Sequence, residues 1–262
     1  MSVFAGVRWS LIGQFGKRGI SFGISVILAR LLAPEDFGLL AMAMFVIGFL
    51  EVFYELGIGS AIIQKKELSS ELLSSLYFMN IVFGLLLGGI LWLSGPVIAG
   101  FYGDPRVARI IGILGLTFVV SSFGVVHEAL LRRNMSFDRL VQIELFVVII
   151  DGTVAVTLAF LGWKVWALVV AIIISKTAFT LLLSLSSSWW PMWCFRWSEV
   201  KKVFRFSLNL TGFKILNYFT RNSHNFIIGR FLGATPLGYY SMAYKFYSYP
   251  LDSISTILGR VL

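Results

Sequence analysis

The sequence predicts an all-α integral membrane protein with about eight transmembrane helices. The chain of 262 residues is 58% hydrophobic and 13% charged, whereas soluble domains carry about 25% charged residues. A helix that crosses a bilayer needs about 20 mostly apolar residues, and runs of this kind recur along the chain. They lie at 8–32, 37–63, 72–100, 107–131, 138–161, 165–187, 203–232 and 237–262.

Turn and capping residues separate these apolar runs. Pro34, Gly162 and Pro236 each stand between two of them, and such residues end helices or begin them. Asp104 and Pro105 have the pattern of an N-cap followed by a proline in the first helical turn. The short connections leave no room for a sizeable domain outside the membrane.

The longest connection is unusually aromatic and basic. It runs from Ser186 to Lys202 and reads SSSWWPMWCFRWSEVKK. Trp, Arg and Lys together are typical of a segment that lies at the membrane surface. We therefore expect a first transmembrane bundle of six helices, a cytoplasmic interfacial linker and the first two helices of a second bundle, at 1–187, 188–202 and 203–262.

The positively charged residues predict the orientation in the membrane. With a cytoplasmic N-terminus, the inside connections hold Arg8, Lys65, Lys66, Arg132, Arg133, Arg139, Arg196, Lys201, Lys202 and Arg205. The outside connections then hold Arg30, Arg106, Arg109, Lys164 and Arg230. Lys and Arg concentrate in cytoplasmic connections, so we expect this orientation. The overall excess of 22 Lys and Arg over 13 Asp and Glu points to anionic lipid and not to nucleic acid.

Two stretches 200 residues apart predict an internal repeat. ARLLAPEDFGLLAMA begins at Ala29 and GRFLGATPLGYYSMA begins at Gly229. Without a gap they match at Arg30/Arg230, Leu32/Leu232, Gly38/Gly238, Met42/Met242 and Ala43/Ala243. Chance similarity of two apolar runs is the alternative. Because six predicted helices lie between the copies, both have the same orientation, which makes the repeat parallel.

The second copy of this repeat holds only two predicted helices. A complete pair of 200-residue units would be longer than the 262 residues of the chain. We therefore expect one complete six-helix bundle, the first two helices of a parallel second bundle, and a chain that is a fragment or a truncated gene product.

Cations lie within the two predicted helices that begin the repeats. With 100° per residue, Lys214 and Arg221 share a face of 203–232, and Lys17 and Arg18 lie on the equivalent part of 8–32. A charge that faces lipid at mid-membrane costs about 2.5–3.5 kcal/mol, so we expect these faces to line a water-filled cavity that attracts anions. The predicted substrate-binding residues are Lys17, Arg18, Lys214, Tyr218, Arg221 and Asn225.

Acidic residues leave other roles open for these cations. Glu51, Glu55, Glu144 and Asp151 lie within predicted helices and are available for ion coupling. The alternative is that they pair with the cations and only hold the bundle together. Lys176 and Lys245 either extend to the membrane surface or line the cavity.

The sequence favours a transporter over an enzyme. The chain has two histidines, His127 and His224, and one cysteine, Cys194, too few for us to expect a metal site. No glycine-rich phosphate loop precedes a Lys-Ser/Thr pair, and no Asp-x-Asp pair is present to hold a metal-bound nucleotide sugar. We expect no cofactor. A membrane glycosyltransferase or ligase is the enzymatic alternative.

Four segments of the sequence carry a family resemblance. They are VRWSLIGQFGKRGISFGISVILARLLAPEDFGLLAMA, GIGSAIIQKKELS, FYGDPRV and LLRRNMSFDRL. They resemble the successive signatures of the bacterial polysaccharide-unit flippases that handle O-antigen and exopolysaccharide, a family of the multidrug/oligosaccharidyl-lipid/polysaccharide exporter superfamily. The resemblance implies two facing six-helix bundles, with helices 1 and 7 lining a central cleft, in the bacterial inner (plasma) membrane.

The resemblance also implies a function. The family moves undecaprenyl-diphosphate-linked oligosaccharide from the cytoplasmic to the periplasmic leaflet for the biosynthesis of lipopolysaccharide and exopolysaccharide. Alternating access is the implied mechanism, with the diphosphate held by Lys17, Arg18, Lys214 and Arg221. The implied partners are the lipid-linked oligosaccharide, membrane lipids, polysaccharide polymerase and glycosyltransferases. Export of drugs or other small amphiphiles, and a non-transporting scaffold of a polysaccharide assembly complex, are the alternatives.

Overall fold

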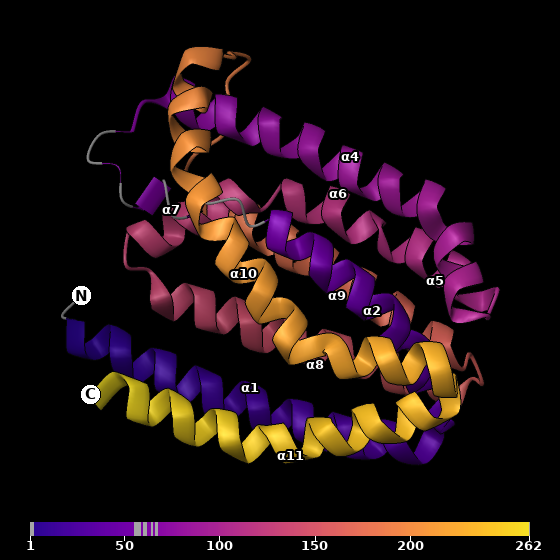
Figure 1. Ribbon diagram of the computed structural model, residues 1–262. Coiled ribbons are helices and arrows are strands. Elements are labelled where there is room, and N and C mark those ends of the chain that lie inside the picture. Colours follow the sequence, from indigo (N-terminus) through magenta and orange to yellow (C-terminus); the bar gives the residue numbers. More distant parts are fainter. Residues whose placement is uncertain (1–2, 55–58, 60–61, 64, 66–67, 262) are drawn as a thin grey trace.

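The computed structural model describes residues 3–54, 59, 62, 63, 65 and 68–261 as a bundle of helices (Figure 1). Within this part of the chain all regular structure is helical, which confirms the predicted all-α class. The helices are α1 (Val3–Leu31), α2 (Pro34–Tyr54), α4 (Ser70–Tyr102), α5 (Arg106–Leu114), α6 (Leu116–Ser122), α7 (Val125–Arg133), α8 (Phe137–Phe160), α9 (Val165–Ser186), α10 (Trp197–Leu232) and α11 (Ala234–Val261).

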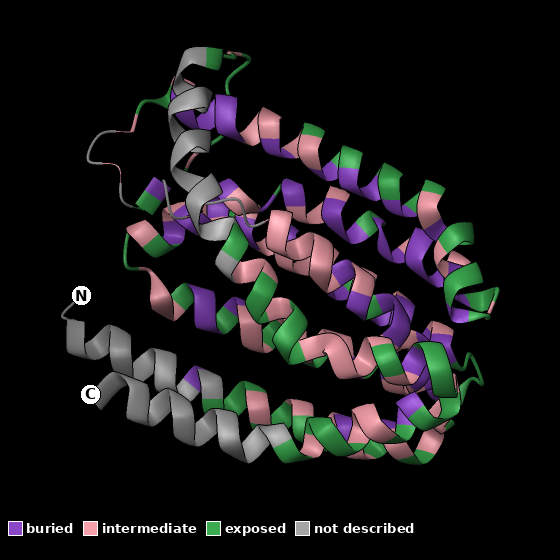
Figure 2. Cartoon of the chain, in the orientation of Figure 1, coloured by how far each residue is buried: buried purple, intermediate pink, exposed green. Residues whose placement is uncertain are grey.

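Four of the described helices, α2, α4, α8 and α9, are long and apolar enough to cross a membrane. The helices from α5 to α7 qualify together as a fifth span that is bent by 46°. Large apolar side chains of α4, among them Leu93 and Val97, are exposed on its outer face (Figure 2), as lipid-facing residues are. The chain is therefore a multi-pass membrane protein.

The predicted count of eight spans is only partly supported. Helices α1, α10 and α11 are long, but they do not reach the apolar character of the other spans. The reason lies in their composition, since α1 contains Lys17 and Arg18 and α10 contains Lys214, Arg221 and Arg230. Helices with so many polar groups need protein or water, rather than lipid, on their polar side.

The predicted helix 107–131 is broken into three pieces in the structure. Gly115 stands between α5 and α6, and Phe123 and Gly124 stand between α6 and α7. The start of α5 agrees with the predicted cap in part. Pro105, rather than Asp104, is the residue directly before the helix, but Oδ1 of Asp104 accepts a hydrogen bond of 2.9 Å from the backbone N–H of Arg106. The start of α10 differs from the prediction as well, because this helix already begins at Trp197, inside the predicted linker 188–202.

The core lies between α2, α4, α5 and α9. Its buried members include Leu39 and Met42 of α2, Leu91 of α4 and Ile111 of α5, and Leu237 of α11 joins the same cluster. Around it α1 packs against α8, α8 against α9, and α11 against α2. Helix α4 lies on one side of the molecule, and α1 and α11 lie next to each other on the opposite side (Figure 1).

The helices that contain the predicted repeat run in matching directions. Helix α1 runs in the same direction as α10, and α2 runs in the same direction as α11 (Figure 1). Helices α2 and α11 touch near their first turns. There a Cβ atom on Gly38 would overlap the carbonyl oxygen of Ala234, and a Cβ atom on Gly238 would overlap that of Pro34. Glycine lets the two backbones approach this closely.

A buried carboxylate connects the α1–α2 connection to the start of α9. Asp36 is only 7% exposed. Its Oδ2 accepts a hydrogen bond of 3.1 Å from the backbone N–H of Ala33, and its Oδ1 accepts one of 2.9 Å from that of Val165. Val165 is the first residue of α9, so Asp36 satisfies one of the N–H groups that a helix start leaves without a partner.

Candidate substrate-binding site

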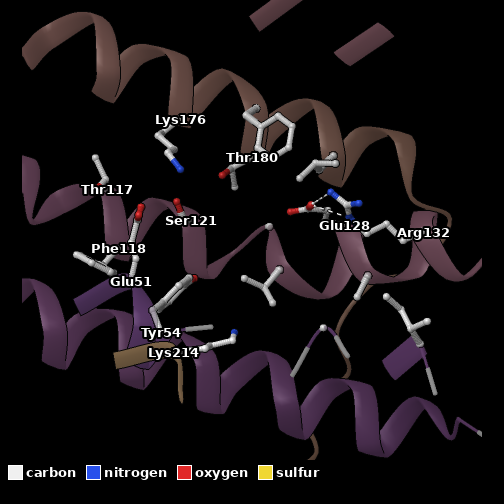
Figure 3. A pocket seen from close by; sticks show the side chains of 17 residues that line it. Glu51, Tyr54, Thr117, Phe118, Ser121, Glu128, Arg132, Lys176, Thr180 and Lys214 are labelled. Atoms are coloured by element: carbon white, nitrogen blue, oxygen red, sulfur yellow. Dashed lines mark hydrogen bonds and ion pairs between the residues drawn. The ribbon is translucent and has the colours of Figure 1, made fainter. Parts of the chain in front are cut away.

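A pocket of about 510 Å³ lies between α2, α6, α7, α9 and α10 (Figure 3). Its charged lining residues come from four of these helices and are Glu51, Glu128, Arg132, Lys176 and Lys214. Hydroxyl groups line the space between them, from Tyr54, Thr117, Ser121 and Thr180. Three cations against two carboxylates, together with several hydroxyls, give the pocket the chemistry to bind an anionic ligand that is rich in oxygen atoms.

The two carboxylates of the pocket lie in different surroundings. Glu128 accepts hydrogen bonds of 3.0 and 2.7 Å from Nε and Nη2 of Arg132, one turn further along α7. This pair lies towards one end of the pocket (Figure 3). Glu51 reaches the pocket from α2 beside Phe118.

The two lysines approach the pocket from opposite walls. Lys176 points into the space from α9, and Lys214 points into it from the side of α2 and α10 (Figure 3). Ser121 and Thr180 place their hydroxyls between α6 and α9 on the Lys176 side. A ligand between the two walls would meet an ammonium group on each side.

Asn80 of α4 positions one wall of the pocket. It is fully buried. Its Nδ2 donates a hydrogen bond of 3.2 Å to the hydroxyl oxygen of Tyr54 and one of 3.0 Å to the backbone carbonyl of Ser122. The tyrosine ring also packs edge-on against Phe118. The Tyr54 side chain is therefore held in place from two sides.

The six predicted substrate-binding residues are not gathered around this pocket. Of the six, Lys214 is the one that lines it. Nζ of Lys17 lies 3.4 Å from Oε2 of Glu144 in α8, which is the pairing that the sequence left open as the alternative. Arg18 is half-buried on α1, and Arg221 is exposed on α10.

Tyr218 and Asn225 of α10 face neighbouring protein. The hydroxyl of Tyr218 donates a hydrogen bond of 2.5 Å to the carbonyl oxygen of Phe45, and its ring lies against Phe45 and Phe49 of α2. Oδ1 of Asn225 is buried and lacks a hydrogen-bond partner among the described residues. A binding role for Arg18, Tyr218, Arg221 and Asn225 therefore stays a prediction.

The predicted ion-coupling acids lie in separate places. Glu51 lines the pocket, whereas Glu144 pairs with Lys17. Asp151 of α8 is half-buried and lies within electrostatic reach of Lys245 of α11. Glu55 falls outside the described residues.

Sequence reasoning missed part of the pocket. Lys176 had two open roles, and the structure places it in the lining. Glu128 and Arg132 were not predicted as site residues, although their spacing of four residues is a known signal for a helical ion pair. Ser121 and Thr180 carry no sequence signal, because single hydroxyl residues are common in membrane helices.

A second cluster joins α4 and α10 at some distance from the pocket. Glu51 lies 13 residues beyond Gly38 on α2, about 20 Å along the helix axis. Near the Gly38 end, Phe101 of α4 stacks on Phe226 of α10 with ring centroids 5.0 Å apart. Cζ of Arg230 lies 5.1 Å from the centroid of the Phe101 ring. We call Phe101, Phe226 and Arg230 the aromatic clamp, because they hold α10 against α4.

A charged cluster lies at this same end of the molecule. Arg106 donates hydrogen bonds of 3.0 and 2.7 Å to the carboxylate of Asp104 and also forms an ion pair with Glu35 at the start of α2. These hydrogen bonds from Arg106 hold the pKa of the Asp104 carboxyl below its usual range. The cluster joins the α4–α5 connection to α2.

Comparisons with known proteins agree with this membrane architecture. A protein family described as "Polysaccharide biosynthesis protein" matches residues 27–262. The chain is 30% identical over 259 residues to the succinoglycan biosynthesis transport protein ExoT of Rhizobium meliloti, covering 98% of this chain and 52% of that protein. It is 28% identical over 260 residues to the lipopolysaccharide biosynthesis protein WzxC of Escherichia coli, covering 98% of this chain and 53% of that protein.

A third relative comes from Bacillus subtilis. The teichuronic acid biosynthesis protein TuaB of Bacillus subtilis is 29% identical over 215 residues, which cover 81% of this chain and 44% of that protein. The chain thus spans about half the length of the curated relatives that it matches. No solved structure shows significant similarity to it. The predicted resemblance to the polysaccharide-unit flippases is confirmed, and the chain belongs to the polysaccharide biosynthesis protein family.

Proposed function

We propose that the chain takes part in moving undecaprenyl-diphosphate-linked oligosaccharide from the cytoplasmic to the periplasmic leaflet of the bacterial inner membrane. The transfer would serve the biosynthesis of cell-surface polysaccharide. The observation that carries this proposal is the pocket itself, in which Lys176, Lys214 and Arg132 meet hydroxyl groups inside a membrane-spanning bundle. The relative ExoT, a succinoglycan biosynthesis transport protein, supports the same class of function.

The pocket suits the polar part of such a substrate. Ammonium groups form charge-assisted hydrogen bonds with diphosphate oxygens, and Lys176 and Lys214, which line opposite walls of the pocket, would form them in this proposal. The hydroxyls of Ser121, Thr180 and Tyr54 match those of sugars. The excess of cations disfavours the alternative of a cationic drug as substrate.

Alternating access is the mechanism that we propose. The Gly38–Gly238 contact and the aromatic clamp close one end of α2, α10 and α11, whereas the pocket lies about 20 Å away from that contact along α2. With a cytoplasmic N-terminus, the closed end is periplasmic and the pocket lies towards the cytoplasm. Movement of α10 and α11 against the rest of the chain would then reverse the access.

A transfer assay with the full-length protein tests the function. Proteoliposomes with a fluorescent lipid-linked oligosaccharide in one leaflet report its arrival in the other leaflet. We expect the variant Lys176→Ala/Lys214→Ala to lose transfer at normal expression, because two charge-assisted contacts worth about 1.5–3 kcal/mol each are removed. The control is Arg109→Ala, which removes an exposed cation outside the pocket. Unchanged transfer by the double variant would refute the proposed site.

A further inference from the structure

The segment between α9 and α10 is fixed onto the first turns of α4. Oγ of Ser74 accepts a hydrogen bond of 2.9 Å from the backbone N–H of Met192, and Oγ of Ser75 accepts one of 2.9 Å from that of Arg196. Nη1 of Arg196 also lies 2.7 Å from a carboxylate oxygen of Glu71. These contacts hold both ends of residues 192–196 against a helix that crosses the membrane.

The inner side of this segment packs into the protein. The ring of Trp189 lies 6.0 Å from that of Tyr77 and 5.5 Å from that of His127, measured between centroids. His127 is only 1% exposed. The inward anchoring of Trp189 and the backbone hydrogen bonds together determine which side chains the segment presents outward.

The outer side of the segment is aromatic and exposed. Trp193 is 97% exposed, and Phe195 and Trp197 are more than half exposed. The ring of Trp193 lies 5.4 Å from that of Phe78 on α4. In a soluble protein such a patch would mark an interaction surface.

A groove of about 470 Å³ is lined by these aromatic residues together with residues of α4. The lining residues are Phe78, Met79, Val82, Trp193, Cys194, Phe195 and Trp197. The volume lies in the range of about 300–1,000 Å³ that is usual for ligand sites. Since the lining carries no charged side chain, a hydrocarbon chain is the chemistry that it fits.

The position of the groove indicates where that chain comes from. Phe78 and Val82 lie 8 and 12 residues beyond Ser70, the first residue of α4, which places the groove about 12–18 Å along the helix from its start. Tryptophan is typical of the depth at which headgroups give way to acyl chains. Arg196, between the groove-lining residues Phe195 and Trp197, is exposed, and basic residues at the membrane surface attract anionic headgroups.

We propose that this groove is a lipid site, in which α4 and residues 193–197 hold one acyl chain of an anionic phospholipid from the leaflet at the α4 N-terminal end. The site is distinct from the oligosaccharide pocket, because the two share no lining residue. It does not depend on the proposed transport function. A bound lipid there would fix the connection from which α10 begins.

Quenching of tryptophan fluorescence tests this site in the full-length protein. The protein is reconstituted in phosphatidylcholine that contains a small fraction of phosphatidylglycerol with brominated acyl chains, which quench only tryptophans that they contact. We expect saturable quenching that is reduced in Trp193→Phe, lost in Trp193→Phe/Trp197→Phe, and competed by unlabelled phosphatidylglycerol. Brominated phosphatidylcholine at the same fraction should quench much less.

Matched variants of α4 decide whether the groove is responsible. Val82→Phe narrows the groove at a position that is 57% exposed, and Val97→Phe makes the same change at a position of α4 that is 75% exposed and lies outside the groove. We expect Val82→Phe to remove the saturable quenching and Val97→Phe to keep it. Equal quenching in both variants, or equal quenching by both lipids, would overturn the proposal. Displacement by undecaprenyl phosphate but not by phosphatidylglycerol would also overturn it, and would assign the groove to the substrate lipid.

Discussion

Gly38 and Gly238 make reciprocal contacts across the α2–α11 interface. Each glycine lies against the backbone carbonyl of the residue that begins the other helix, Ala234 for Gly38 and Pro34 for Gly238. Gly38 and Gly238 are 200 positions apart, and so are Pro34 and Ala234. A shift of 200 residues therefore turns each of the two contacts into the other. Such an exchange is the property of an interface with twofold symmetry, and it supports a parallel repeat.

The first prediction concerns this interface. Gly38→Ala and Gly238→Ala should each destabilise the protein by about 1–3 kcal/mol, because the added methyl group overlaps a backbone carbonyl that has little freedom to move. The measurement is thermal unfolding of the full-length protein in detergent. Gly89→Ala is the matched control, because a Cβ atom at Gly89 of α4 meets nothing within 4 Å, so this change should be neutral or stabilising. Equal effects at all three positions would contradict the close approach.

The second prediction concerns the role of Lys17. If its ion pair with Glu144 is structural, Lys17→Met and Glu144→Gln should each reduce stability slightly, and the double variant should cost less than the sum. The coupling of a partly exposed pair is at most about 1 kcal/mol, and a double-mutant cycle of unfolding measures it. A substrate-binding lysine would instead lose transfer in Lys17→Met whether or not Glu144 is also replaced. The two outcomes separate the alternatives that the sequence left open.

The third prediction concerns the buried carboxylate of Asp36. Asp36→Ala leaves the N–H groups of Ala33 and Val165 without their acceptor and should cost about 1.5–3 kcal/mol for each charge-assisted bond. Asp36→Asn keeps one acceptor oxygen and should cost less. Thermal unfolding of the two variants in parallel provides the comparison. An asparagine variant as unstable as the alanine variant would show that the charge, rather than the acceptor, is what matters.

Much of the fold was predictable because membrane helices are apolar runs bounded by turn residues. Pro34 and Pro236 lie close to the starts of α2 and α11. The breaks at Gly115 and Gly124 were not predictable, since glycine within an apolar run leaves the hydropathy unchanged and only packing decides whether the helix bends. The sequence predicted Lys214 as a site residue, because it shares a face of 203–232 with Arg221.

The partners of each charged residue were harder to predict than its position on a helix. Lys176 and Arg132 reach the same pocket as Lys214 from helices far apart in the chain, and periodicity places a side chain on a face without saying which helix that face meets. Lys17 is a second example. The sequence indicates the polar face of the helix that carries Lys17, but the ion pair of Lys17 with Glu144 depends on how α1 packs against α8, which the sequence does not show.

The fourth prediction concerns acid sensitivity at the charged cluster. Arg106 lowers the pKa of Asp104 in the folded protein, so the ionised carboxylate contributes stability that is fully present above the unfolded pKa of about 4. This contribution is lost as the pH falls through the lower folded pKa. Unfolding temperatures between pH 6 and pH 3 should therefore fall more steeply for the unmodified protein than for Arg106→Gln. Arg109→Gln, which changes an exposed arginine of the same helix, should follow the unmodified protein.

The last prediction concerns the aromatic clamp. In Arg230→Ala the cation–π contact with Phe101 is lost, which removes about 0.5–1 kcal/mol at an exposed site. If the clamp closes one side of an alternating-access cycle, this loss shifts the equilibrium towards the open state by roughly two- to fivefold. Spin labels at Gly100 and Phe231, both exposed beside the clamp, report the separation of α4 and α10 by pulsed electron spin resonance.

We expect a single short distance between these labels in the unmodified protein and an additional longer distance in Arg230→Ala. Phe101→Ala should populate the longer distance further, because it removes both the cation–π contact and the stacking on Phe226. Arg109→Ala removes a cation of α5 outside the clamp and should leave the distribution unchanged. A single short distance in all variants, in the presence and absence of lipid-linked oligosaccharide, would show that α4 and α10 move as one body. The opening would then have to occur elsewhere, and the aromatic clamp would be a static contact of the fold.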